Sequence, residues 1–147
     1  MELILWRHAD AEDRIPDDAR ALTPKGLKQA ERIAKWLRRR LPEGVVILAS
    51  PARRAQQTAQ ALTRDFETSR RVGTEATPQG ILKVVHWPHG RRPVLVIGHQ
   101  PTLGQVAALV MTGAAAEWSI GKGALWWFES RGREEVALRA VIGPEMV

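Results

Sequence analysis

Three short apolar segments each end beside residues that can bind or attack a phosphoryl group. Arg7 and His8 follow the first segment, Arg54 lies just beyond the second, and His99 follows the third. Guanidinium groups bind phosphate oxygens through paired hydrogen bonds, and a neutral imidazole can act as a nucleophile. Histidines beside several arginines suit a phosphoryl group better than any other common ligand. The apolar segments themselves cover residues 3–6, 45–49 and 94–97.

The three segments have the character of buried strands. Each is a continuous apolar run bounded by residues typical of turns, as in parallel strands that are covered on both faces. In open α/β sheets, ligands bind in the crevice outside the carboxyl ends of the strands. We therefore expect the histidines and arginines to meet at one edge of one sheet.

Each of these side chains has an expected role in phosphoryl transfer. His8 is the candidate nucleophile, with one ring nitrogen held as a donor to a backbone carbonyl so that the other can attack phosphorus. Arg7 and Arg54 can grip the phosphoryl oxygens, and His99 can donate a further hydrogen bond. Such transfer depends mainly on positioning and charge neutralisation. Because arginines supply the positive charge, we expect no metal and no cofactor.

The pattern alternates between strand and helix through the first two-thirds of the chain. Helices are predicted to begin at Thr23-Pro24, at Ser50-Pro51 and at Pro101-Thr102, and Gly113 is expected to end the third. The first helix has apolar side chains at helical spacing, which predicts one face packed on a sheet. These are residues 27, 30, 33, 34, 37 and 41.

The middle and the C-terminal third complete the expected fold. A short strand is predicted near residues 71–74 and a short helix near residues 80–85. Residues 124–128 and 135–142 flank a predicted hairpin turn at residues 130–133. The sequence therefore predicts an α/β fold, a three-layer sandwich with a mainly parallel sheet, helices on both faces and an antiparallel C-terminal hairpin. At 147 residues, we expect one domain.

The composition limits the classes of partner and the location. Lysine and arginine total 22 against 16 aspartates and glutamates, a net charge of +6 that favours anionic partners. No zinc-finger or ribonucleoprotein motif accompanies this charge, so nucleic acid is not the expected partner. The chain has no cysteine and no apolar run long enough to span a membrane, and its first residues predict a strand rather than a signal segment. The expected location is cytoplasmic, without membrane attachment.

Two other motifs carry weaker signals. His86 and His89 have a spacing that invites a metal site, but Pro88 lies between them and no carboxylate motif surrounds them. We do not expect them to be ligands. The fragment Gly121-Lys122-Gly123 resembles part of a phosphate loop, lacks the rest of that motif, and is interpreted as a turn before the hairpin.

Four motifs in the right order and spacing resemble the histidine phosphatase superfamily, and within it the compact SixA-type phosphohistidine phosphatases. They are Arg7-His8-Ala9, Leu22-Thr23-Pro24-Lys25-Gly26, Ser50-Pro51-Ala52-Arg53-Arg54-Ala55-Gln56-Gln57-Thr58-Ala59 and Gly98-His99-Gln100-Pro101. The resemblance covers nearly the whole chain and implies a single histidine-phosphatase-like domain over residues 1–147.

The resemblance also implies roles for individual residues. His8 would become the phosphohistidine, Arg7 and Arg54 would bind the phosphoryl group, and His99 would complete the pocket. Arg54 matches the motif arginine and its neighbour Arg53 does not. Arg20 stands where SixA-type members commonly carry another phosphate-binding arginine, as a looser match.

The chain differs from the wider family in two features, the catalytic acid and the insertion that covers the pocket. Mutases and broad phosphatases of the family carry a catalytic glutamate in an insertion that covers the pocket. Here the middle region is short, and Glu75 is the candidate proton donor at roughly the right place, with a poor match. An uncovered pocket can admit a side chain that projects from a protein. The resemblance therefore favours phosphohistidine of a partner protein as substrate.

Three alternatives remain open from the sequence. A small phosphorylated metabolite could be the substrate, because the core pocket is the same for both kinds of substrate. A phosphate-binding or phosphoprotein-binding module without turnover is a second alternative, disfavoured because His8 is intact. A basic nucleic-acid-binding protein is the third, and a binding assay at moderate salt would test it.

Overall fold

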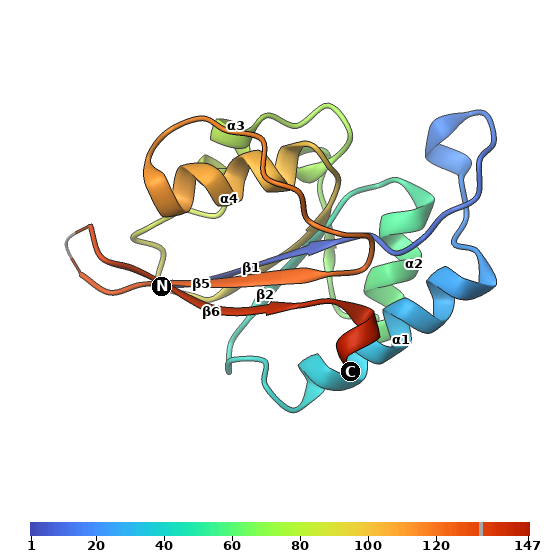
Figure 1. Ribbon diagram of the computed structural model, residues 1–147, viewed down its shortest axis with the longest axis horizontal. Helices are drawn as coiled ribbons and strands as arrows, with labels where there is room; N and C mark the ends of the chain where they lie inside the picture. Colours follow the sequence, from blue (N-terminus) through green and yellow to red (C-terminus); the bar gives the residue numbers. More distant parts are fainter. Residues whose placement is uncertain (133) are drawn as a thin grey trace.

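The structure, a computed structural model, describes residues 1–132 and 134–147, and its centre is a six-stranded sheet in the order β3-β2-β4-β1-β5-β6. β3, β2, β4 and β1 run parallel to one another, whereas β5 pairs antiparallel with both β1 and β6 (Figure 1). The mainly parallel sheet and the antiparallel C-terminal pair are confirmed. The strands are β1 (Glu2–Arg7), β2 (Val46–Ala49), β3 (Glu67–Thr68), β4 (Val94–Gly98), β5 (Leu125–Ser130) and β6 (Val136–Ile142).

Helices cover both faces of the sheet and make the predicted three-layer sandwich. α1 (Pro24–Arg38) and α2 (Arg53–Leu62) lie on one face, and α3 (Pro78–Val84) and α4 (Thr102–Thr112) lie on the other (Figure 1). Side chains of one strand alternate between the two cores. In β1, Leu3 and Leu5 belong to the core beside α4, whereas Ile4 and Trp6 belong to the core beside α1 and α2. Because these strands are buried on both faces, their sequences are unbroken apolar runs.

The helix ends follow the sequence signals closely. The side chain of Thr23 accepts a hydrogen bond of 3.0 Å from the backbone N–H of Gly26, and Pro24 occupies the first helical position of α1. α4 ends at Gly113, whose φ of 74° lies in the left-handed region that glycine adopts without strain. Leu27 departs from the predicted buried face of α1, since 46% of its surface is exposed.

Two local predictions need correction. α2 begins at Arg53, after a short irregular stretch, rather than at Ser50-Pro51. Residues 70–72 form a short 3-10 helix, η2 (Arg70–Val72), because the side chain of Ser69 accepts a hydrogen bond from Arg71 N–H and caps a turn. The short strand predicted near residues 71–74 does not form there; β3 lies earlier, at residues 67–68, and pairs with the end of β2. The predicted turn at 130–133 includes Arg133, which lies outside the described residues.

Within the described part of the chain, no helix has both the length and the apolar character needed to cross a membrane.

Candidate active site

The ends of β1 and β4 bring two histidines together. Arg7 pairs in register with Gly98, and the backbone N–H of His8 donates to the carbonyl of Gly98 over 3.1 Å. His8 and His99, one residue beyond each strand, are therefore neighbours, with ring centroids 5.3 Å apart. Both rings are buried. Parallel pairing thus places two distant imidazoles in one pocket.

His8 is held in one tautomer by its own loop. Its Nδ1 lies 2.8 Å from the carbonyl oxygen of Ala9, which can only accept, so Nδ1 carries the proton and the Nε2 lone pair is available. Ala9 N–H in turn donates to the Thr58 hydroxyl, and that hydroxyl donates to the carbonyl of Arg54. Burial, and then the nearby positive groups, lower the pKa of His8 to about 3. His8 is therefore a neutral imidazole at physiological pH.

His99 is positioned by Ser50. The His99 Nε2 and the Ser50 Oγ are 2.7 Å apart, and both side chains are buried. Ser50 Oγ also accepts a hydrogen bond from Ala52 N–H, so the hydroxyl proton of Ser50 remains available for donation to His99 Nε2. If Nε2 of a neutral His99 accepts this hydrogen bond, the ring proton of His99 is on Nδ1. Burial, followed by the charge of Arg54, lowers the pKa of His99 to about 4.

Two arginines flank the histidines and are fixed by backbone carbonyls. Arg7 Nη1 donates to the carbonyl of Ile120 over 3.0 Å, and Arg54 Nη1 donates to the carbonyl of Asp17 over 2.9 Å. Arg54 Nη2 also forms an ion pair of 3.1 Å with the Asp17 carboxylate. The Arg54 side chain is 4% exposed, and burial lowers the pKa of Arg7. Both guanidinium groups are therefore held in place by contacts within the protein.

Three buried side-chain atoms lack a hydrogen-bond partner among the described residues, and all three belong to this cluster. They are Nε of Arg7, Nε of Arg54 and Nδ1 of His99. A buried polar group without a partner costs free energy, so such groups need an explanation. Their clustering matches an oxyanion as the bound ligand, since its oxygens accept from several donors at once.

Arg20 joins the cluster through Asp17 rather than directly. Arg20 Nη1 and Arg54 Nη2 bind different oxygens of the Asp17 carboxylate, at 3.2 and 3.1 Å. Partial burial raises the pKa of Asp17, but the hydrogen bonds from Arg20 and Arg54 outweigh it and bring that pKa below its ordinary value. Arg20 Nε is held by the carbonyl of Glu12. Asp17 therefore links the two arginines at the edge of the pocket.

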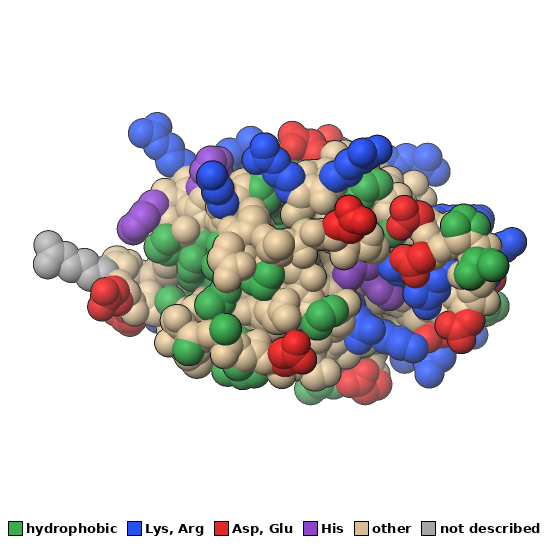
Figure 2. Space-filling model, turned by 90° about the horizontal axis from the view of Figure 1, so that it is seen from above, with side chains coloured by type: hydrophobic (Ala, Val, Ile, Leu, Met, Phe, Trp, Pro, Cys, Tyr) green, Lys and Arg blue, Asp and Glu red, His purple; other side chains and the backbone are tan. Residues whose placement is uncertain are grey.

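Glu75 lies outside the histidine pair. It is exposed and lines a cavity of about 290 Å³ together with Ser50, Arg70 and Asp18. Because Ser50 holds His99, this cavity adjoins the pocket. Figure 2 shows histidine side chains in a hollow between basic and acidic side chains on this face. Glu75 thus shares a cavity with Ser50, the residue that holds His99.

Sequence reasoning missed four contributors to this site. They are the Ser50 hydroxyl, the Asp17 carboxylate, the Thr58 hydroxyl and the carbonyl of Ile120. The role of Thr58 could have been predicted, since Thr58 lies four residues after Arg54 on the helix and faces the same side. The contact of Arg7 with a carbonyl more than a hundred residues away has no counterpart in local sequence.

Among residues 1–132 and 134–147, no group of three or more His, Cys, Asp or Glu side chains is placed so that it could hold a metal ion.

The lowered pKa values of the histidines predict a dependence of stability on pH. An unfolded histidine gains its proton near pH 6.5, but folded His8 and His99 gain theirs only near pH 3 and 4. Between these limits the unfolded chain binds more protons, so the free energy of unfolding should fall as the pH falls below about 6.5. Urea titrations across pH 4–7 would measure this. In His99→Asn, the dependence on pH should be weaker; an unchanged dependence would contradict the assignment of His99.

Comparisons with known proteins agree with the geometry. The sequence profile of the Histidine phosphatase superfamily (branch 1) matches residues 3–76. The phosphohistidine phosphatase SixA of Escherichia coli is 32% identical over 122 residues, which are 77% of this chain and 76% of that protein. A protein named SixA from Nakamurella multipartitia superposes with a TM-score of 0.82 at 25% identity, covering 97% of this chain and 95% of the other. A SixA structure complexed with tungstate gives 0.79 at 22% identity, covering 98% and 97%.

The matched profile begins in β1 and spans the segments that contribute His8 and Arg54, and the SixA structures share the fold over nearly the full chain. The chain therefore belongs to the histidine phosphatase superfamily and is a phosphatase of the SixA-like type.

Proposed function

We propose that this phosphatase removes the phosphoryl group from phosphohistidine of a partner protein, through a phosphohistidine intermediate on His8 and without a metal. The observation that carries this proposal is the cluster of unpaired buried atoms on Arg7, Arg54 and His99 around the neutral His8 ring. Together they provide a nucleophile and donors for a phosphoryl group.

The proposed reaction has two steps. First, Nε2 of His8 forms a bond to phosphorus while the bond from phosphorus to the leaving nitrogen breaks, and that nitrogen takes up a proton. Next, a water molecule attacks the phosphorus and gives up one proton to solvent, and the bond to Nε2 breaks to release phosphate and neutral His8. Arg7, Arg54 and His99 would bind the phosphoryl oxygens in both steps, where fixed donors are most effective.

Two features of the chain support a protein substrate. Between α2 and β4 the described chain holds β3, η2 and α3, and none of these elements forms a hydrogen bond with the side chain of His8 or Arg54. The site is thus reached from the surface at the sheet edge, where a projecting side chain could enter. The leaving nitrogen of phosphohistidine is readily protonated, so its loss depends less on a strong acid than loss of an alkoxide does.

The second candidate is a small phosphorylated metabolite, and the position of Glu75 favours it. A carboxylic acid beside the cavity at Ser50 could protonate the oxygen that leaves a phosphate ester. Initial rates on a histidine-phosphorylated protein and on sugar and nucleotide phosphates would separate the two candidates, with His8→Ala as the blank. Preference for a small phosphate by more than about tenfold in kcat/KM would overturn the protein-substrate proposal.

Glu75→Gln is expected to leave hydrolysis of phosphohistidine and of an aryl phosphate nearly unchanged. The reason is that both leaving groups depart without a strong acid, and that the Glu75 side chain is exposed and forms no hydrogen bond with a described residue of the pocket. Steady-state kinetics on both substrates would measure the effect. A loss of about 100-fold would instead identify Glu75 as the proton donor and make esters the favoured substrates.

A further inference from the structure

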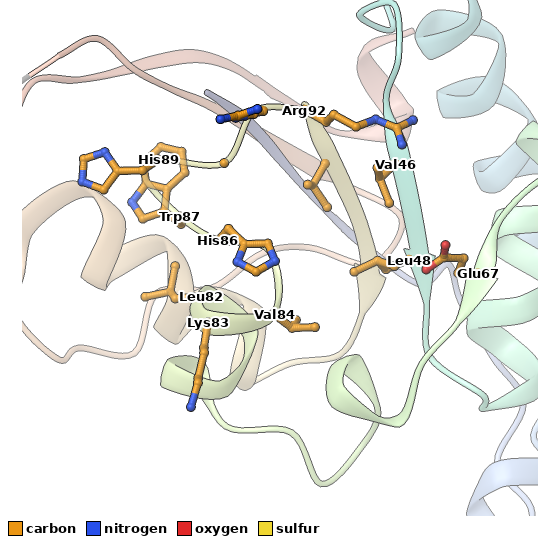
Figure 3. A pocket seen from close by; sticks show the side chains of 13 residues that line it. Val46, Leu48, Glu67, Leu82, Lys83, Val84, His86, Trp87, His89 and Arg92 are labelled. Carbon is orange, nitrogen blue, oxygen red and sulfur yellow. The ribbon is translucent and has the colours of Figure 1, made fainter.

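A second cleft lies at the opposite end of the sheet from His8. Its volume is about 860 Å³, and its apolar lining comes from β2, α3, the turn after α3 and the start of β4 (Figure 3). The apolar side chains are Val46, Leu48, Leu82, Val84, Trp87 and Val94. Val46 and Val94 are the first residues of their strands, whereas His8 and His99 follow the carboxyl ends. The cleft is therefore separate from the catalytic pocket.

The rim of this cleft is strongly basic. Lys83, Arg91 and Arg92 line it and are exposed, against a single lining carboxylate, Glu67. None of the three cations takes part in an ion pair between described residues. Arg92 Nε donates to the carbonyl of Gly44 over 2.8 Å, which holds that guanidinium at the rim. A ligand of complementary chemistry would combine apolar side chains with several negative charges.

A further basic side chain, that of Arg70, lies on the catalytic side of the molecule, in a cavity that Asp18 and Glu75 also line. η2 packs against α3 and β4, and its Arg70 lines the cavity beside Ser50. Figure 2 shows Lys and Arg side chains gathered along one edge of this face. An extended acidic segment could follow this edge from the cleft toward the pocket.

We propose that the cleft binds an acidic segment of the partner protein, with Leu or Phe side chains on the floor and Asp or Glu side chains against Lys83, Arg91 and Arg92. This inference rests on the proposed function, since it names a recognition element of that same protein substrate. Binding at two sites raises the local concentration of the phosphohistidine at the pocket to the millimolar range. The cleft would then select the protein while Arg7, Arg54 and His99 recognise the phosphoryl group.

The first experiment measures binding to the cleft directly. Its probe is a fluorescein-labelled short peptide in which Asp and Glu flank Leu and Phe, compared with a peptide carrying Asn and Gln instead. The variant is Lys83→Glu/Arg91→Glu, and the matched control is Lys35→Glu/Arg64→Glu, which makes the same charge change at exposed residues outside the cleft. We expect the cleft variant to weaken binding about tenfold and the control to leave it unchanged.

Binding should also perturb the indole N–H resonance of Trp87 and weaken as salt is added, because exposed charges are screened. Equal binding of the neutral peptide, equal affinity of the cleft variant, or a single-stranded oligonucleotide that binds this cleft more tightly than the acidic peptide would each overturn the inference.

The second experiment links the cleft to turnover. In the cleft variant, KM for a histidine-phosphorylated protein should rise about tenfold, while kcat/KM for p-nitrophenyl phosphate stays at the wild-type value. An unchanged KM for the protein would overturn the inference and leave the proposed function intact. If the wild-type enzyme hydrolysed no phosphohistidine protein, the proposed function would fail, and peptide binding alone would then decide whether the cleft recognises acidic segments.

Discussion

His8→Ala is expected to lower kcat/KM for p-nitrophenyl phosphate by at least about 10⁴-fold, because it removes the nucleophile on which both steps depend. The loss should come without unfolding, since the ring donates its hydrogen bond to the carbonyl of the adjacent Ala9. His89→Ala provides a matched control, because His89 is exposed and lines the other cleft. Its kcat/KM should remain within about twofold of the wild type.

The same variant separates an enzyme from a binding module. Arg7, Arg54 and His99 remain in place in His8→Ala, so the variant should still bind inorganic phosphate, and calorimetry would show it. Retained turnover in this variant would contradict the role of His8. Wild-type protein that binds phosphate tightly but turns over at the rate of His8→Ala would support the binding-module alternative.

Arg54→Ala is expected to lower kcat/KM about 10³-fold, within the range seen when a transition-state donor or cation is removed. Arg54 is buried and anchored by Asp17, so its charge is fixed beside the histidines before substrate binds. Arg54→Lys should recover only a small part of the loss, because an ammonium cannot reproduce the fork of guanidinium donors. Steady-state kinetics on an aryl phosphate would measure both variants.

Arg53→Ala is the matched control for Arg54, since it removes the adjacent arginine of the same helix. Arg53 is exposed, whereas Arg54 is buried. We expect Arg53→Ala to keep wild-type kcat/KM. A larger loss for Arg53→Ala than for Arg54→Ala would show that the pocket uses the other guanidinium.

The parts of the fold that position the site could be predicted because their signals are local and strong. Runs such as residues 94–97 are apolar on both faces, which indicates buried parallel strands, and parallel strands end at one edge. That reasoning places His8 beside His99 without knowledge of the rest of the chain. The Thr23 cap and the Gly113 terminus were predictable for the same reason, since each depends on one residue and its immediate neighbours.

The parts that could not be predicted depend on contacts between distant residues. Ser50 precedes α2 and is predicted by sequence to start it, but its hydroxyl instead holds His99, 49 residues away. Asp17 lies in a loop crowded with charges, so its particular link between Arg20 and Arg54 has no sequence signature. The turn at residues 70–72 was mistaken for a strand because a single side-chain cap, from Ser69, decides it.

The most direct test of the account is to trap the phosphoenzyme. Wild-type protein would be mixed with p-nitrophenyl phosphate, quenched in alkaline denaturant to preserve phosphohistidine, and digested for peptide mass spectrometry. The account predicts one phosphoryl group on the peptide that contains His8, assigned to that residue by fragmentation and lacking in His8→Ala. A phosphoryl group on His99 or on any other residue of the wild-type protein would contradict it.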